Sequence, residues 1–343
     1  DFVVLGDDPL TAEDIAGIGS GSHSTGYTHI TLHDGVTVKA TGGGNSSLGG
    51  GGGAGIGSGN RAKGNTDILI KGATKVTAKG GSTAAGIGSG NGSNGSTIIN
   101  IEGGTITAEG GGKENGSCQA SGAGIGSGGN ALNKTTINIK GGEITATGGV
   151  SLDSRNHSDK WLSGAGIGSG DNGEMSGNIT ITDSAEVVST SGYDGAGIGS
   201  GENRKMSGTI TIDGNAKVTA WSERQGAGIG AGENGGVSGT IWIGGNASVK
   251  AGSACDGAGI GGGGDEDGHI LESGKIIICG NAEVIAIGED EGCGIGGGED
   301  AKMKGMILIR DNANVTAIGG GRAAAIGTDD AGDLSGSILI LGN

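Results

Sequence analysis

The stretch Gly164-Ala165-Gly166-Ile167-Gly168-Ser169-Gly170 decides the fold, because close copies of it recur ten times along the chain. Five of the nine intervals between successive copies are 31 residues, and the other four are 38, 38, 42 and 35 residues. A fixed repeat with insertions is typical of a solenoid, in which each copy forms one coil of a rod. The central isoleucines of the ten copies are Ile18, Ile56, Ile87, Ile125, Ile167, Ile198, Ile229, Ile260, Ile295 and Ile326.

One clean copy, Gly195–Gly226, contains three short segments with the pattern of β-strands. The motif itself is followed by Thr209-Ile210-Thr211-Ile212 and then by Ala216-Lys217-Val218-Thr219-Ala220. Alternation of apolar and polar residues predicts strands with one buried face. Three such strands cannot form a core alone, so we expect like strands of successive coils to pair in parallel, about 4.8 Å apart.

A tight turn of nearly constant length joins the second and third strands, and an asparagine recurs in it. We predict that these side chains stack as a ladder of amide-to-amide hydrogen bonds along the rod. The asparagines are Asn215, Asn246, Asn281, Asn312 and Asn343.

The predicted fold class is therefore all-β: a right-handed parallel β-helix of about ten coils with three short strands each. The handedness follows from the general preference of parallel crossover connections. We interpret residues 1–14 as an N-terminal cap or partial coil and residues 15–343 as a single solenoid domain. A thin core of Ile, Val and Ala agrees with this fold, since aromatic residues make up only 2% of the chain.

The net charge of −16 argues against nucleic acid as a partner, because phosphate binding needs clustered Lys and Arg. The sequence holds no apolar run long enough to span a bilayer. The four cysteines, Cys118, Cys255, Cys279 and Cys293, fall at different places in the repeat. This spacing predicts free thiols rather than disulfides or a zinc site.

Insertions interrupt the repeat, and the long ones lie in the loop that leads from the third strand back to the next motif. We expect the binding face of the rod along this edge, because insertions into a repeat map to loops on one face. The insertions are Thr41–Gly53, Glu109–Gly122, Thr147–Gly164 and, between the motif and the second strand, Asp265–Lys275.

Three of the six aromatic residues, Trp161, Tyr193 and Trp221, lie in this loop in consecutive coils. Exposed indole and phenol rings suit stacking on the C–H faces of sugars. The sequence therefore predicts a saccharide-binding edge, although these rings can equally serve to cover the coil where insertions open it. Polar residues nearby that would join a ligand site are Asp153, Arg155 and Arg224.

Carboxylates on the same edge leave a catalytic alternative open. Glycoside hydrolases need two carboxyl groups about 5–9 Å apart, a distance that neighbouring coils can provide. The candidate residues are Asp159, Asp194 and Glu223, although each can equally be a solvated loop residue.

A second row of acidic residues follows the glycine motif in the later coils. We expect these side chains to be solvated, with a bridging Ca²⁺ as the less favoured alternative. The row consists of Asp171, Glu202, Glu233, Asp265, Glu299 and Asp329. Its densest part, Asp265-Glu266-Asp267, is the best calcium candidate in the sequence, and we expect no organic cofactor.

The pattern of Gly-Ala-Gly-Ile-Gly-Ser-Gly followed by Thr-Ile-Thr-Ile and Asn-Ala-Lys-Val-Thr-Ala resembles a known group of repeats. It is similar to the glycine-rich repeat regions of large secreted or wall-attached proteins of Gram-positive gut bacteria. The resemblance covers Ile15–Asn343 and implies a β-helical, carbohydrate-binding or adhesin-like region, secreted or on the cell surface, with flanking domains. It carries over no catalytic residue.

Three functions remain open from the sequence. The leading hypothesis is an extracellular module that binds a glycan or polysaccharide along the insertion edge. The alternatives are a glycoside hydrolase or polysaccharide lyase on the same edge, and a purely structural spacer.

Overall fold

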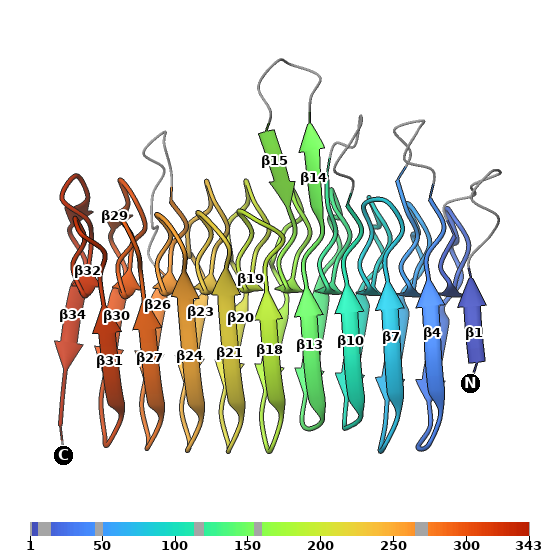
Figure 1. The fold of residues 1–343 in the computed structure, drawn as a ribbon, viewed down its shortest axis with the longest axis horizontal. Helices are drawn as coiled ribbons and strands as arrows, with labels where there is room; N and C mark the ends of the chain where they lie inside the picture. Colours follow the sequence, from blue (N-terminus) through green and yellow to red (C-terminus); the bar gives the residue numbers. More distant parts are fainter. Residues whose placement is uncertain are drawn as a thin grey trace.

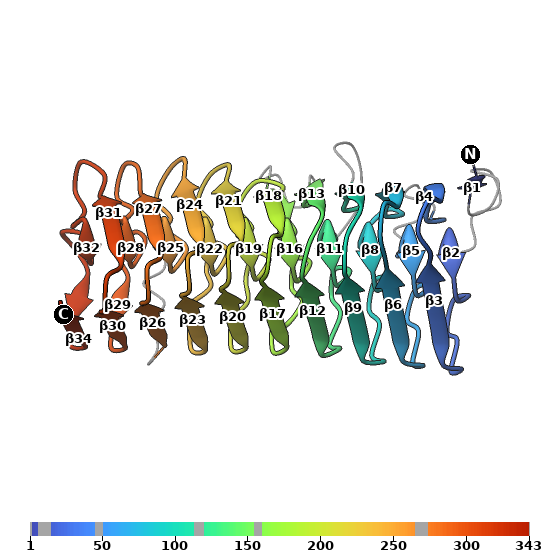
Figure 2. The ribbon, with the colours of Figure 1, turned by 90° about the horizontal axis from the view of Figure 1, so that it is seen from below.

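The structure, a computed structural model, describes residues 2–5, 15–44, 51–112, 120–153, 160–264 and 274–342. Three parallel sheets of ten strands each run side by side along a rod, with the two termini at opposite ends (Figures 1 and 2). The predicted all-β parallel β-helix of ten coils with three short strands is confirmed. Among the described residues, none forms a helix with the length and apolarity needed to cross a membrane.

Sheet B is built from the isoleucine and the following glycine of each motif. Its strands are β2 (Ile18–Gly19), β5 (Ile56–Gly57), β8 (Ile87–Gly88), β11 (Ile125–Gly126), β16 (Ile167–Gly168), β19 (Ile198–Gly199), β22 (Ile229–Gly230), β25 (Ile260–Gly261), β28 (Ile295–Gly296) and β32 (Ile326–Gly327).

Sheet C contains the second strand of each coil. Its strands are β3 (Thr28–Leu32), β6 (Thr66–Ile70), β9 (Thr97–Ile101), β12 (Thr135–Ile139), β17 (Asn178–Ile181), β20 (Thr209–Ile212), β23 (Thr240–Ile243), β26 (Lys275–Ile278), β30 (Met306–Ile309) and β34 (Ser337–Ile340).

Sheet A contains the third strand of the first nine coils and begins with the N-terminal segment, which pairs Phe2 with Val38. Its strands are β1 (Phe2–Leu5), β4 (Thr37–Thr41), β7 (Lys75–Lys79), β10 (Thr105–Glu109), β13 (Glu143–Thr147), β18 (Glu186–Thr190), β21 (Lys217–Ser222), β24 (Ser248–Ser253), β27 (Glu283–Ile287) and β31 (Asn314–Ile318).

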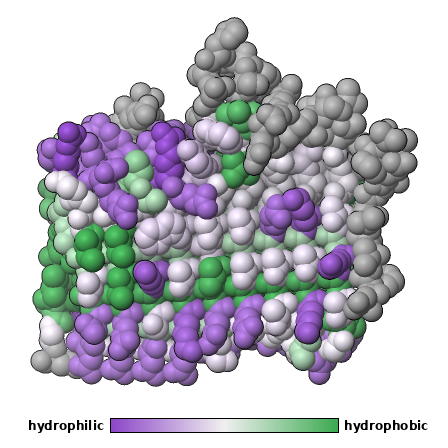
Figure 3. All heavy atoms as spheres, in the orientation of Figure 1, coloured by the Kyte–Doolittle hydropathy of each residue, from purple (hydrophilic) through white to green (hydrophobic). Residues whose placement is uncertain are grey.

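The core lies between the three sheets and repeats in every coil. In the clean copy, Ile198, Ile210, Ile212 and Ala220 are each 0% exposed and Val218 is 3% exposed. Burial of a side chain the size of Ile contributes roughly 1.5–3 kcal/mol to the stability of the fold. Because similar side chains are buried in successive coils, each of these coils adds a similar amount. Figure 3 shows the consequence on the surface, where bands of one colour run along the long axis.

The glycine after each motif isoleucine is required by the stacking. Gly199 has a φ of 144°, which residues other than glycine rarely adopt. A Cβ atom there would lie 1.8 Å from the carbonyl oxygen of Gly230. On the other face of the motif, a Cβ at Gly197 would lie 2.6 Å from the backbone nitrogen of Trp221. The bare glycine face is therefore covered by the chain itself and is scaffold.

The turn between sheets C and A carries the predicted asparagine ladder. Asn246 Nδ2 donates to Asn215 Oδ1 at 3.2 Å, Asn281 Nδ2 to Asn246 Oδ1 at 3.1 Å, and Asn312 Nδ2 to Asn281 Oδ1 at 3.2 Å. The prediction is confirmed for these four residues, whereas Asn343 lies outside the described residues.

Two small sheets stand apart from the three long ones. The antiparallel pair β14 (Val150–Asp153) and β15 (Lys160–Ser163) projects from the insertion edge (Figure 1). The parallel pair β29 (Lys302–Met303) and β33 (Asp333–Leu334) joins the last two coils.

Candidate functional site: the insertion edge

The hairpin β14–β15 is anchored to the coil below it by buried hydroxyl groups. Ser151 Oγ donates to the carbonyl oxygen of Ala120 at 2.8 Å, and Ser121 Oγ donates to that of Leu162 at 2.8 Å. Leu162 is buried, whereas its neighbour Trp161 is half-buried. The insertion thus holds one indole ring at a fixed place on the edge.

Trp161, Tyr193 and Arg224 come from three consecutive coils and form what we call the ring–arginine cluster. The centroids of the Trp161 and Tyr193 rings are 5.3 Å apart and their planes are inclined by 39°. The guanidinium carbon of Arg224 lies 5.5 Å from the centroid of the Tyr193 ring, within cation–π range. The prediction that aromatic side chains of successive coils meet on this edge is therefore confirmed for Trp161 and Tyr193.

Trp221 does not join the cluster. A Cβ atom at Gly252 would lie 2.1 Å from the Trp221 ring, so this indole covers a glycine of the following coil. Trp161, in contrast, meets Tyr193 from the preceding coil. The expectation that all three rings share one binding surface stays a prediction for Trp221, whose ring packs against Gly252.

A cavity of about 630 Å³ lies beside the ring–arginine cluster, and we call it the glycine groove. Gly192 and Glu223, which line it, directly precede Tyr193 and Arg224 of the cluster. Its remaining lining includes backbone of the sheet A strand ends and Lys79, Thr107, Glu109, Thr147 and Val150, with the glycines Gly110, Gly111, Gly112, Gly148 and Gly149.

The polar side chains of the groove are partly paired. Lys79 Nζ donates to Glu109 Oε1 at 2.6 Å, and both side chains remain about half exposed. Glu223, one of the carboxylates considered for catalysis, is also exposed and lines the groove. Asp159 lies outside the described residues, as do Arg155 and the side chain of Asp153.

Asp194, the third catalytic candidate, is buried with a side chain only 2% exposed. Its Oδ2 atom lies 3.7 Å from Arg224 Nη1, which links it to the ring–arginine cluster. Burial and the charge of Glu202 raise the pKa of Asp194, Arg224 lowers it, and the net value is about 6. Asp194 therefore supports Arg224 from below and does not offer its carboxylate to a ligand on the surface.

Part of the acidic row is buried, contrary to the expectation that these side chains are solvated. Asp171 and Glu202 are 0% exposed, whereas Glu233 is half-buried. Amides compensate the charges in part: Asn172 Nδ2 donates to Asp171 at 2.8 Å, and Asn203 Nδ2 donates to Glu202 at 3.0 Å.

One carboxylate oxygen each from Asp194, Glu202 and Glu233 lies within 4.8 Å of the other two. These three groups are close enough to surround one cation, with Arg224 as the neighbouring positive charge. Sequence reasoning considered Asp194 and the other two separately and did not bring them together. The calcium candidates Asp265, Glu266 and Asp267 lie outside the described residues.

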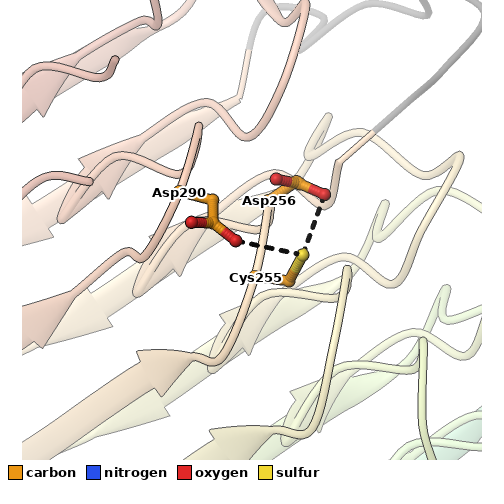
Figure 4. A group of neighbouring side chains, drawn as sticks. All are labelled: Cys255, Asp256 and Asp290. Carbon is orange, nitrogen blue, oxygen red and sulfur yellow. Dashed lines mark hydrogen bonds between the residues drawn. The ribbon is translucent and has the colours of Figure 1, made fainter. Parts of the chain in front are cut away.

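A further cluster, which the sequence did not predict, joins Cys255, Asp256 and Asp290 (Figure 4). Cys255 Sγ donates to Asp256 Oδ2 at 3.0 Å and lies 3.6 Å from Asp290 Oδ2. Burial raises the pKa of the Cys255 thiol to about 12, and the hydrogen bond to Asp256 adds to the rise. The thiol is therefore a hydrogen-bond donor at neutral pH, although the same three groups offer ligand atoms to a thiophilic metal.

The cysteines that the structure describes, Cys255, Cys279 and Cys293, are free. This agrees with the prediction of unpaired, partly buried thiols, and Cys118 lies outside the described residues.

A family model described as Beta helix repeat matches residues 68–91, 99–129, 137–171 and 210–233. No curated protein and no solved structure matches the chain. The matched segments run through strands of sheets B, C and A and contain the third, fourth, fifth and seventh copies of the motif. These segments contribute strands to all three of the ten-stranded parallel sheets. The chain is therefore a β-solenoid that carries β-helix repeats.

Proposed function

We propose that this β-solenoid is an extracellular carbohydrate-binding, adhesin-like module that binds a glycan or polysaccharide along its insertion edge. The observation that supports the proposal is the ring–arginine cluster beside the glycine groove. The module would be part of a larger secreted or cell-surface protein, next to flanking domains.

The ring–arginine cluster offers the apolar part of such a site. Trp161 and Tyr193 are half-buried, so each ring keeps an accessible part while its position is fixed by packing. An amphipathic ring can stack on the C–H face of a pyranose and still hydrogen-bond through its polar tip. Arg224, held by Asp194, supplies hydrogen-bond donors next to the rings.

The glycine groove offers the polar part. Glycines keep its floor free of side chains, and Thr107 and Thr147 add hydroxyl groups. Lys79 and Glu109 neutralise each other, which suits the neutral hydroxyl groups of a sugar better than a strongly charged ligand. A groove along the strand ends of several coils also matches the extended shape of a polysaccharide.

The scaffold lowers the cost of binding. The cluster and the groove rest on strands whose neighbours on both sides are fixed by the parallel ladders. Since less conformational freedom is lost on binding to a rigid surface, modest contacts can give useful affinity.

The proposal is tested on a glycan array with the wild-type protein and the Trp161→Ala variant. We expect the wild type to bind at least one class of glycan and the variant to lose at least about tenfold in affinity, equal to about 1.4 kcal/mol. Trp221→Ala is the matched control, because it removes a tryptophan from the same edge but outside the cluster. Its affinity is expected to stay within about threefold of the wild type.

Two outcomes would overturn the proposal. Absence of binding to every glycan would favour a structural spacer. Release of reducing ends from a bound polysaccharide, abolished by Glu223→Gln, would favour a glycoside hydrolase.

A further inference from the structure

Three carboxylates gather near the C-terminal end of the rod, away from the ring–arginine cluster. Glu291 lies in the loop between β27 and β28, whereas Asp329 and Asp330 follow β32 in the next coil. One carboxylate oxygen of each lies within 4.8 Å of the other two. A cluster of acidic residues alone means little, so the surroundings of each carboxylate decide whether it is a site.

Asp329 provides the decisive observation. Its residue is 6% exposed, and its Oδ2 atom accepts a hydrogen bond from the backbone N–H of Asp300 at 3.0 Å. Its Oδ1 atom is buried, and no group in the described part of the chain donates a hydrogen bond to it. A buried carboxylate oxygen without a donor is costly unless something positively charged occupies the space next to it.

Gly332 packs its backbone closely against Asp329. A Cβ atom at Gly332 would lie 2.5 Å from Asp329 Oδ1 and 2.6 Å from the carbonyl oxygen of Ala301. The φ angle of Gly332 lies outside the left-handed region, so the backbone there does not itself require glycine. Glycine is needed because any side chain at this position would press against the unsatisfied oxygen atom of Asp329.

The spacing and chemistry of the three carboxylate oxygens favour calcium. Ca²⁺ binds carboxylate and carbonyl oxygens at about 2.3–2.6 Å, so ligand atoms on opposite sides of the ion are about 4.8 Å apart. Mg²⁺ needs shorter distances of about 2.0–2.1 Å and a stricter octahedron. Arg322 Nη1 donates to Glu291 Oε1, and this guanidinium offsets one of the three negative charges. A divalent cation would balance the other two.

We propose that Glu291, Asp329 and Asp330 form a Ca²⁺-binding site, with the carbonyl oxygen of Ala301 beside the ion. The ion ties the loop before β28 to the turn after β32, and so it fastens the last two coils to each other. The site is independent of glycan binding, since it lies on other coils.

The test is a calorimetric titration of the whole chain with CaCl₂, after a chelator has removed bound metal. Salt at about 0.15 M screens non-specific binding of Ca²⁺ to acidic residues on the surface. We expect one site with a Kd of about 10⁻⁵–10⁻³ M and a Ca²⁺-dependent rise of the thermal transition. Two variants remove the site in different ways. Asp329→Asn removes the buried charge, and Gly332→Ala displaces Asp329 Oδ1 by a steric clash without changing any charge.

Both variants are expected to lose at least about tenfold in Ca²⁺ affinity. Asp333→Asn, an exposed residue of the same turn, is the matched control and is expected to bind as the wild type does. Folding is checked by the thermal transition in chelator, where Asp329→Asn is expected to be no less stable than the wild type because it lacks the uncompensated charge. Wild-type protein that binds no Ca²⁺ at about 10 mM, or variants that bind as tightly as the control, would overturn the site.

Discussion

The turn between sheets C and A and the edge between sheets A and B differ in almost every respect, although each coil contributes to both. The turn repeats Asn215, Asn246, Asn281 and Asn312 in register and binds them into one ladder. The edge carries a hairpin in one coil, a buried acid in the next and a cysteine two coils later.

The difference has a physical origin. A ladder gains one hydrogen bond per coil only where adjacent coils place the same group at the same position, which the turn does from Asn215 to Asn312. The edge lies outside the sheets, and a longer loop there costs little, because loop-closure entropy grows slowly with length. A solenoid can therefore keep its framework constant and vary one edge, and variation of that edge is where a specific function fits.

The strongest way to break the framework is Gly199→Ala in the sheet B motif. The added Cβ would lie 1.8 Å from the carbonyl oxygen of Gly230, at a φ of 144°. We expect a loss of about 3 kcal/mol or more in the free energy of unfolding, measured by urea denaturation. Gly26→Ala is the control, since no atom lies within 4 Å of its added Cβ, and it should change stability by less than about 0.5 kcal/mol. Equal effects of the two changes would contradict this account of the motif.

The buried acid of the edge gives the second effect, which depends on pH. The pKa of Asp194 is raised to about 6, above the value of about 3.9 in an unfolded chain. The folded state therefore holds this proton more tightly, so the contribution to stability is complete below about pH 4 and is lost as the pH rises towards 6. Two pKa units correspond to about 3 kcal/mol.

The measurement compares wild type and Asp194→Asn by urea denaturation at pH 4 and pH 7 in chelator. Between these pH values the stability difference is expected to shift by about 3 kcal/mol in favour of the variant, which has no charge to bury. Parallel pH profiles of the two proteins would show that Asp194 titrates normally.

The third prediction sharpens the role of the asparagine ladder. Asn246→Ala removes the bond that Asn246 donates to Asn215 and the bond that it accepts from Asn281. Both bonds are exposed to solvent, so we expect a loss of only about 1 kcal/mol. Lys250→Thr, on the exposed face of the following strand, should leave stability unchanged. A loss of more than about 3 kcal/mol for Asn246→Ala would contradict the view that the ladder contributes only two solvent-exposed hydrogen bonds at this residue.

The smallest expected effect on stability belongs to the residue with the largest expected effect on binding. Trp161→Ala should cost less than about 1 kcal/mol, because the hairpin lies outside the core. Ile243→Ala also shortens a large apolar side chain, but in the core of the coil, and should lower the free energy of unfolding by about 2–5 kcal/mol. Thermal unfolding of both variants measures the contrast. Similar losses would show that the hairpin is part of the framework, and a binding defect in Trp161→Ala would then be ambiguous.

The fold could be predicted closely because its signals are local and periodic. The interval of 31 residues sets one coil, alternation such as Thr209–Ile212 sets the buried face, and the asparagines mark the turn. Once the period is known, the register follows, as Ile198 opposite Ile229 illustrates. In a repeat protein the period therefore indicates which distant residues pair, whereas the sequence of a globular protein does not show this directly.

The site was predicted only in part. Trp161 and Tyr193 could be placed on one edge from their coil positions, but the ring direction of Trp221 depends on the glycine beside it, Gly252. The acidic row was expected in solvent because a sequence shows the spacing of charges and not the loop that covers them. Cys255 and Asp290 are 35 residues apart, which equals the local interval from Ile260 to Ile295, so this pair had a signal that spacing could have found.

The sequence by itself determined the number of coils, their three strands and the edge on which insertions gather, because each follows from a period along the chain. Only the tertiary structure decided which side chains of that edge meet, which are buried and which oxygen atoms lack a donor. These depend on rotamers and loop paths in three dimensions, where a neighbour one coil away matters as much as a neighbour in sequence. Oδ1 of Asp329, which is buried without a hydrogen-bond donor in the described part of the chain and packs closely against Gly332, is such a feature, and no period in the sequence indicates it.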